Sequence, residues 1–304
     1  MSKIKSVNIN IKTLTAAVLT AGSLFITGCS SAPKRPMQVS TIYSSAKEMI
    51  ESANSCILTG DFDRAILFLA TAETQAMSID NYDLLIAAAL TKCSLALSQN
   101  PPQLEKAAFE NQTAKSYAGF CKNPKKQEAL VALNEVRIAI ADETSSSMDY
   151  KKLLTKLEDN QKNVKGDAYY ENQFLTVKGD LYRLMKNYTE ADRVFTAAAQ
   201  NYTKNFYLTE IGMCWYKAAQ ARSLGGYKDS AIEALDKAIQ YDRDAENSLA
   251  LGTDYYALGL ILLKAPATAA DKEKAVYAFN HSADIFEAIN EATLAQKSRD
   301  AANE

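Results

Sequence analysis

Apolar residues recur along most of this chain at the three- and four-residue spacing of an amphipathic helix, and the alternation typical of strands is hardly seen. Ala, Leu, Lys, Glu and Gln are abundant, whereas the 304 residues include only 11 Gly and 6 Pro. The pattern therefore predicts an all-α protein. Between residues 81 and 165 it predicts four helices, at Asp83–Ser98 and Leu104–Ala118 around Pro101-Pro102, and at Gln127–Ala141 and Tyr150–Asn163 around a Ser-rich turn.

One unit of small and large residues recurs at intervals of about 35 to 45 residues, which is typical of helical repeats. Small residues let two antiparallel helices approach closely, and large residues on the same faces fill the gaps between them. Each pair alone leaves an apolar face exposed, so that the pairs must stack. The copies comprise Leu175, Gly179, Tyr182, Ala191 and Phe195; Trp215, Ala219, Ala231 and Leu235; Tyr255, Gly259, Ala275 and Phe279; and, earlier, Gly60 to Ala65 with Leu69 and Ala72.

These positions resemble the tetratricopeptide repeat, although the proline that usually closes each unit is absent. The resemblance covers about two thirds of the chain after residue 28 and implies a superhelical solenoid of about five to six helix pairs over residues 40–304. The connection at 264–271, which contains Pro266, is interpreted as an insertion between paired helices. Stacks of this kind usually bind other proteins.

In that family one face of the first helices lines a concave groove. Tyrosine on this face suits binding, since it offers a large area with few rotors and a polar tip; the alternative is that Tyr216 and Tyr256 pack against the adjacent repeat. Chaperone-binding members carry Lys and Asn one turn apart to hold a C-terminal carboxylate, and no Lys-x3-Asn pair on a first helix is found here. The matching groove positions are Thr176, Asp180, Arg183, Tyr216, Gln220, Tyr256, Leu260 and Leu263.

The first 28 residues predict a cleaved export signal. Lys3, Lys5 and Lys12 form a basic leader, and the apolar run from Leu14 to Ile26 is shorter than the roughly 20 residues that span a membrane. The segment Leu24-Phe25-Ile26-Thr27-Gly28-Cys29 resembles the lipobox of bacterial lipoproteins, which implies that Cys29 is lipidated and that residues 29–39 are a tether. Ser30 in place of Asp implies the outer membrane, with the protein facing the periplasm.

Without the signal, 31 Lys and Arg residues stand against 36 Asp and Glu residues, a net charge of about −5. A weakly acidic surface argues against nucleic acid as a partner. Export allows disulfides to form, yet the four other cysteines lie in or beside apolar helical stretches, where small buried thiols are expected. Whether Cys56, Cys93, Cys121 and Cys214 form disulfides is left open, including a bond between Cys56 and Cys93.

No active-site pattern is found in the sequence. His281 is the sole histidine, which argues against a Ser-His-Asp triad and against a His-rich metal site. Gly225-Gly226 is not followed by the Lys and Ser or Thr of a phosphate-binding loop, and carboxylates such as Asp180 and Glu190 are scattered over helix surfaces. Neither a cofactor nor a catalytic residue is expected.

The sequence thus favours a membrane-anchored scaffold that binds a protein or peptide partner in a concave groove, in envelope assembly or secretion. An alternative is an accessory lipoprotein of a solute uptake system, which works with a periplasmic solute receptor. A third hypothesis, an enzyme, has the least support. The expected partners are a protein and, through the lipid, a membrane; neither nucleic acid nor a small-molecule ligand is expected.

Overall fold

The computed structural model describes residues 40–142 and 148–303. The predicted signal, Cys29, the tether and the Ser-rich turn lie outside these residues. The helices described below lie in one compact unit, Ile42–Glu304, apart from Thr41, the first residue of the first helix.

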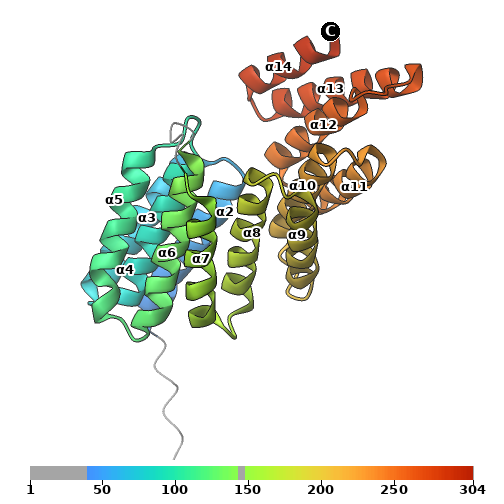
Figure 1. Cartoon of the computed structure of the whole chain (residues 1–304). Coiled ribbons are helices and arrows are strands. Elements are labelled where there is room, and N and C mark those ends of the chain that lie inside the picture. The colour runs from blue at the N-terminus through green and yellow to red at the C-terminus, as the bar shows by residue number, and fades with distance from the viewer. Residues whose placement is uncertain (1–39, 143–147, 304) are drawn as a thin grey trace, which may run out of the picture. The chain divides into compact units, whose positions relative to one another are not determined.

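The described residues form α-helices and two short 3-10 helices, without a strand (Figure 1). All four helices that the sequence predicts between residues 81 and 165 are confirmed, with bounds that shift by at most three residues. The helices are α2 (Thr41–Leu58), α3 (Phe62–Ser78), α4 (Tyr82–Leu97), α5 (Leu104–Tyr117), η1 (Ala118–Phe120), α6 (Pro124–Ala141), α7 (Tyr150–Gln161), η2 (Lys162–Val164), α8 (Ala168–Leu184), α9 (Tyr188–Thr203), α10 (Leu208–Leu224), α11 (Lys228–Asp244), α12 (Ser248–Leu262), α13 (Ala269–Ala288) and α14 (Ala292–Asn303).

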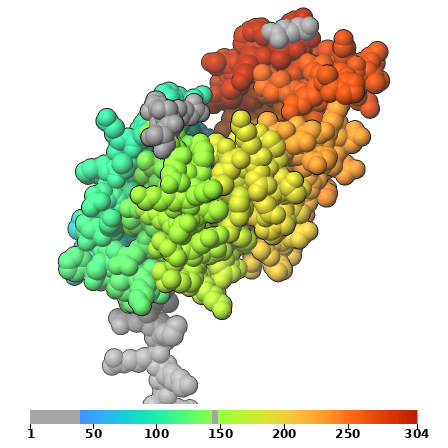
Figure 2. Space-filling model, viewed as in Figure 1, coloured from blue at the N-terminus to red at the C-terminus, as the bar shows by residue number. Residues whose placement is uncertain are grey.

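Helices that follow one another in the chain pack as pairs, from α2 with α3 to α12 with α13, and α14 packs on the last pair. The first helices of successive pairs also contact one another, as α4 does α6, α6 does α8 and α10 does α12. Side chains fill the space between neighbouring helices from α6 to α9, drawn green to yellow in Figure 2. The described part therefore contains six helix pairs in a stack, and the predicted helical solenoid is confirmed.

The recurring small residues make close helix contacts in the second half of the stack. A Cβ atom placed on Gly179 of α8 would lie 2.5 Å from the Phe195 ring of α9, and one on Gly259 of α12 would lie 2.4 Å from the Phe279 ring of α13. Both rings are about 1% exposed or less. Glycine at these positions lets each ring lie against the backbone of the partner helix, which explains the sequence repeat.

Local signals begin and end the helices. The side chains of most N-cap residues accept a hydrogen bond from the backbone amide three positions on, which satisfies a free amide of the first turn. Many turns then pass through one residue with positive φ, such as Lys186 at 59° and Gly226 at 86°, forty positions apart. The N-caps with this bond are Asp61, Asn81, Asn123, Asp149, Asp167, Asn187, Asn247 and Thr268.

Two lysines hold the connection between α12 and α13: Lys264 within it donates to the Ser223 carbonyl oxygen at 2.8 Å, and Lys228 of α11 binds it from outside. The Lys228 ammonium donates to the carbonyl oxygen of Leu262 at 2.8 Å and to that of Pro266 at 3.3 Å, and it forms an ion pair with Asp271 at 3.1 Å. The inserted segment is therefore a fixed part of the stack.

The four cysteines of the described part carry free thiols. Cys56, Cys93 and Cys214 are buried as the sequence predicts, whereas Cys121, for which burial is also expected, is only partly buried. Among the described helices, none is both long and apolar enough to cross a bilayer.

Candidate partner-binding groove

A groove of about 400 Å³ runs along the first helices of five successive pairs, α2, α4, α6, α8 and α10. Its apolar lining includes Ile50, Ile57, Leu90, Leu133, Val177 and Met213, at least one from each helix. Near one side of the groove, the turn after α2 touches the start of α12, because a Cβ on Gly60 would lie 2.8 Å from Leu249 Cδ2. We call the cavity lined by these five helices the groove.

Arg137 of α6 is the prominent cation in the wall of the groove. Its Nη1 donates to Asn134 Oδ1 at 3.1 Å, and its Nη2 donates to Gln173 Oε1 of α8. Asn134 is only 3% exposed. Two amide oxygens therefore orient the guanidinium, and no ion-pair partner for it lies among the described residues.

A tyrosine and a glutamate also line the groove, Tyr169 of α8 and Glu210 of α10. Burial raises the pKa of Glu210. Burial also raises the pKa of Tyr169, the charge of Glu210 raises it further, and the charge of Arg137 opposes the rise. Tyr169 is therefore close enough to both charged groups to be influenced by each of them.

The second cation of the groove wall is neutralised. Lys217 of α10 forms an ion pair with Asp180 of α8 at 2.5 Å, and the side chains are 23% and 14% exposed. The groove thus holds one paired and one unpaired cation within the described residues.

Two of the eight predicted groove residues, Thr176 and Asp180, line this groove. Thr176 is 4% exposed, and its hydroxyl donates to the Asn172 carbonyl oxygen at 2.9 Å. Asp180 is held by Lys217. Both predicted residues therefore contribute surface, but their polar groups are already engaged.

Three predicted residues form a second group on α8 and α10. Burial raises the pKa of Tyr216, and Gln220 and Arg183 lie close enough to oppose this rise. The Arg183 Nε atom is buried without a hydrogen-bond partner among the described residues. Tyr216 also packs against the core formed by α9 to α12. These three residues do not line the groove.

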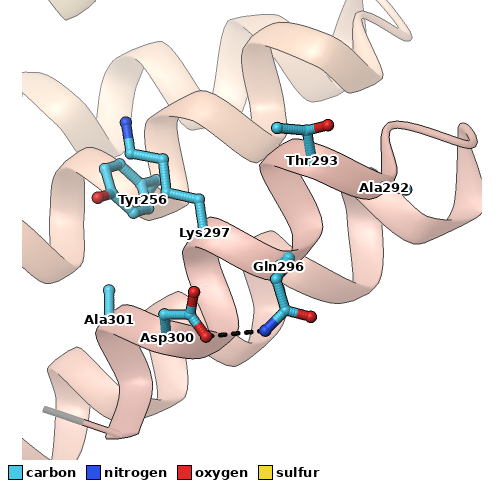
Figure 3. A pocket seen from close by; sticks show the side chains of 7 residues that line it. All are labelled: Tyr256, Ala292, Thr293, Gln296, Lys297, Asp300 and Ala301. Carbon is cyan, nitrogen blue, oxygen red and sulfur yellow. Dashed lines mark hydrogen bonds between the residues drawn. The ribbon is translucent and has the colours of Figure 1, made fainter.

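The last three predicted residues lie on α12. Tyr256 lines an open pocket of about 650 Å³ against α14, where the Lys297 ammonium lies 4.9 Å from its ring centroid (Figure 3). The Tyr256 ring also lies 5.4 Å from the Phe279 ring. Leu260 and Leu263 are 49% and 40% exposed and line neither cavity. The structure therefore does not bring all eight predicted residues into one site.

The residues that the sequence prediction missed lie on a neighbouring face of the same helices. On α8 this face carries Tyr170, Gln173 and Val177 beside the predicted Asp180, and forty residues later α10 contributes Glu210, Met213 and Lys217. Positions three and four apart share a helix face. A search for polar residues at this spacing would have found Gln173 and Lys217, whereas Arg137 lies in a helix where the repeat is not recognisable.

A buried pair of acids links α11 and α12. Asp242 and Asp254 are each 1% exposed, and a Cβ on Gly212 of α10 would lie 2.6 Å from Asp242 Oδ1. Burial raises the pKa of Asp254, and repulsion from Asp242 raises it further. The two carboxylates therefore titrate as a pair, and this pair keeps its last proton to a higher pH than an isolated aspartate does.

Within residues 40–142 and 148–303, no group of three or more His, Cys, Asp and Glu side chains is placed to hold a metal ion.

Comparisons with known proteins give matches to solved structures alone. No protein-family model matches the chain, and no curated protein matches it. The apo form of RapI is similar over 83% of this chain and 68% of its own, with a TM-score of 0.57 and 12% identity. A STAND signal transduction ATPase with a tetratricopeptide repeat sensor, from Pyrococcus horikoshii, is similar over 83% of this chain, with a TM-score of 0.51 and 15% identity.

The fold is a tetratricopeptide-like helical solenoid. The chain spans 41% of the length of the ATPase. At these low identities, the likeness shows the path of the chain and does not show a function.

Proposed function

We propose that this protein is a membrane-anchored, non-catalytic scaffold that binds a protein partner in the groove. In this proposal Cys29 is lipidated, the helical domain faces the periplasm from the outer membrane of a bacterium, and the partner belongs to envelope assembly or secretion. The tetratricopeptide-like fold supports the scaffold role, and the repeats of the similar ATPase are described as a sensor.

The observation that carries the proposal is the composition of the groove. Leucine, isoleucine and methionine side chains alternate there with amide, hydroxyl and charged groups from five helices. Protein interfaces combine an apolar centre with polar groups in this way, and buried anchors supply most of their binding energy. No general base or nucleophile with an activating partner is recognisable among the groove residues, so the surface suits binding better than chemistry.

Crosslinking in whole cells tests the proposal. A photoreactive amino acid at Met213, in the groove, should capture a defined partner. The same amino acid at Leu67 of α3, which is 66% exposed on a second helix of a pair, serves as the control. We expect a discrete adduct from position 213 and none from position 67. Equal capture at both positions, or none at either, would contradict the proposal; capture of a solute receptor would favour the uptake role.

The anchor is tested separately. Lipid attachment needs the thiol of Cys29, so Cys29→Ser should leave an uncut precursor without lipid. Metabolic labelling with a palmitate analogue and the size of the protein on a gel measure this outcome. A Cys29→Ser protein that still runs at the mature size and extracts with membranes would refute lipidation.

A further inference from the structure

The Arg137 guanidinium has hydrogen-bonding capacity that the described residues do not use. An arginine carries five N–H donors, and the two bonds to Asn134 and Gln173 engage only two of them. Both acceptors are neutral amides, so the positive charge is not compensated. Lys217, the other cation of the groove, has Asp180 at 2.5 Å. The difference between the two cations indicates that Arg137 is oriented for an acceptor from outside the chain.

The neighbours of Arg137 restrict the chemistry of that acceptor. Glu210 also lines the groove, but it forms no ion pair with Arg137 among the described residues. Leu133 and Ile140 on the same helix line the groove with apolar atoms. Arg137 is half-buried, and a planar carboxylate matches its guanidinium fork with two parallel hydrogen bonds. The site therefore suits a carboxylate that is flanked by apolar groups.

The remaining polar lining indicates what carries that carboxylate. Asn54, Thr91 and Ser94, on α2 and α4, line the groove among the leucine and isoleucine residues. The Asn54 amide and the Ser94 hydroxyl donate to carbonyl oxygens of their own helices, and their side-chain oxygens accept no hydrogen bond from the described residues. An extended peptide needs hydrogen-bond partners for its backbone along its whole length, because each residue brings one donor and one acceptor. A small free carboxylate has no such need, so polar groups spread over several helices match a peptide better.

We propose that Arg137, positioned by Asn134 and Gln173, binds an acidic side chain of an extended peptide segment from the protein partner, with apolar residues of that segment on either side. This inference rests on the proposed function and adds the chemical class of the bound segment. Glutamate and aspartate flanked by leucine, isoleucine or phenylalanine are the residues that the site should select.

Peptide display on the purified full-length protein in detergent tests this specificity. A random dodecapeptide library is selected against the wild type, against Arg137→Gln, and against Arg193→Gln as a matched control. Arg193 is exposed on α9 and pairs with Glu190 within its own helix. We expect acidic residues beside apolar ones to be enriched by the wild type and the control, and that enrichment to be lost with Arg137→Gln.

Titration of the best peptide then measures the contact itself. Because a hydrogen bond to a charged group contributes about 1.5–3 kcal/mol, the wild type should bind the acidic peptide about tenfold to a hundredfold more tightly than its Glu→Gln counterpart. Arg137→Gln should bind both equally. An equal ratio in the two proteins would overturn the inference. A peptide with an amidated C-terminus shows whether Arg137 binds the acidic side chain or the C-terminal carboxylate. Loss of binding on amidation would overturn the side-chain assignment.

A second variant keeps the test valid if Arg137→Gln folds poorly. Gln173→Glu would place a carboxylate beside the Arg137 guanidinium, so it should retain the fold and abolish the preference for acidic peptides.

The outcome of the peptide selection separates this inference from the proposed function. Enriched peptides without acidic residues would overturn the inference and leave the proposed function standing. If no peptide is selected and hexanoate alone raises the melting temperature, both the peptide ligand and the proposed function are contradicted.

Discussion

The two halves of the helical stack are held together by different kinds of contact. From α8 to α13 the units repeat every forty residues, and glycine on one helix lies against a phenyl ring of the next. From α2 to α7 the helices are less regular, and polar groups join them: Asn111 of α5 is 3% exposed and donates to the Val131 carbonyl oxygen of α6 at 3.1 Å. The regular half shows how pairs are built, whereas the irregular half supplies Arg137 and most of the groove.

The residues that define the repeat and the charged residue that the groove offers to a partner therefore lie in different parts of the sequence. Repeat positions are under packing constraints, which make them recognisable from one unit to the next. A binding residue such as Arg137 needs only its own neighbours, Asn134 and Gln173, and leaves no periodic trace.

The largest expected effect is on the packing of the regular half. Phe195 is fully buried against Gly179, so Phe195→Ala should lower the free energy of unfolding by about 3–5 kcal/mol. Phe109→Ala is the matched control, because Phe109 of α5 is 68% exposed and should change stability by less than about 0.5 kcal/mol. Urea unfolding followed by circular dichroism measures both. Similar losses in the two variants would contradict the placement of the close contacts.

The helices could be predicted from the sequence because their signals are local. Asp and Asn N-caps such as Asp61 and Asn81, the three- and four-residue spacing and the glycine positions all lie within one or two turns. The groove could not be predicted as well, because the face that each helix turns inward depends on how the pairs stack. The predicted Tyr216 lies one residue from Lys217, which lines the groove, and a rotation of about 100° separates consecutive positions.

A smaller effect comes from the same substitution made in each half. Gly179→Ala places a methyl group within 2.5 Å of Phe195 and should cost about 1–3 kcal/mol through overpacking. Gly119→Ala, in η1 of the irregular half, meets no atom within 4 Å and should be close to neutral. Thermal melts of the two variants compare them directly. Adding Phe195→Leu to Gly179→Ala should restore part of the loss, and a purely additive pair would argue against the contact.

The pH dependence of stability distinguishes the halves further. The pKa of Asp254 is raised in the folded state, so its proton stabilises the fold at mildly acidic pH, and this contribution is lost as the pH rises above the ordinary carboxyl range. The expected slope is at most about 1.4 kcal/mol per pH unit for each proton. Asp254→Asn should flatten this slope and stabilise the protein above neutral pH. Asp244→Asn, exposed on α11, should not; equal slopes in the wild type and Asp254→Asn would rule out the shared proton.

The central claim is that the groove itself receives the partner, and filling it is the most direct test. Ala87 of α4 lines the groove, so Ala87→Trp should obstruct it while the melting temperature stays close to that of the wild type. In whole cells the adduct captured at position 213 should then fall by about tenfold, the change that a loss of 1.4 kcal/mol produces. Leu67→Trp on the exposed side of α3 should leave the yield unchanged. An unchanged adduct yield with a folded Ala87→Trp protein would contradict binding in the groove.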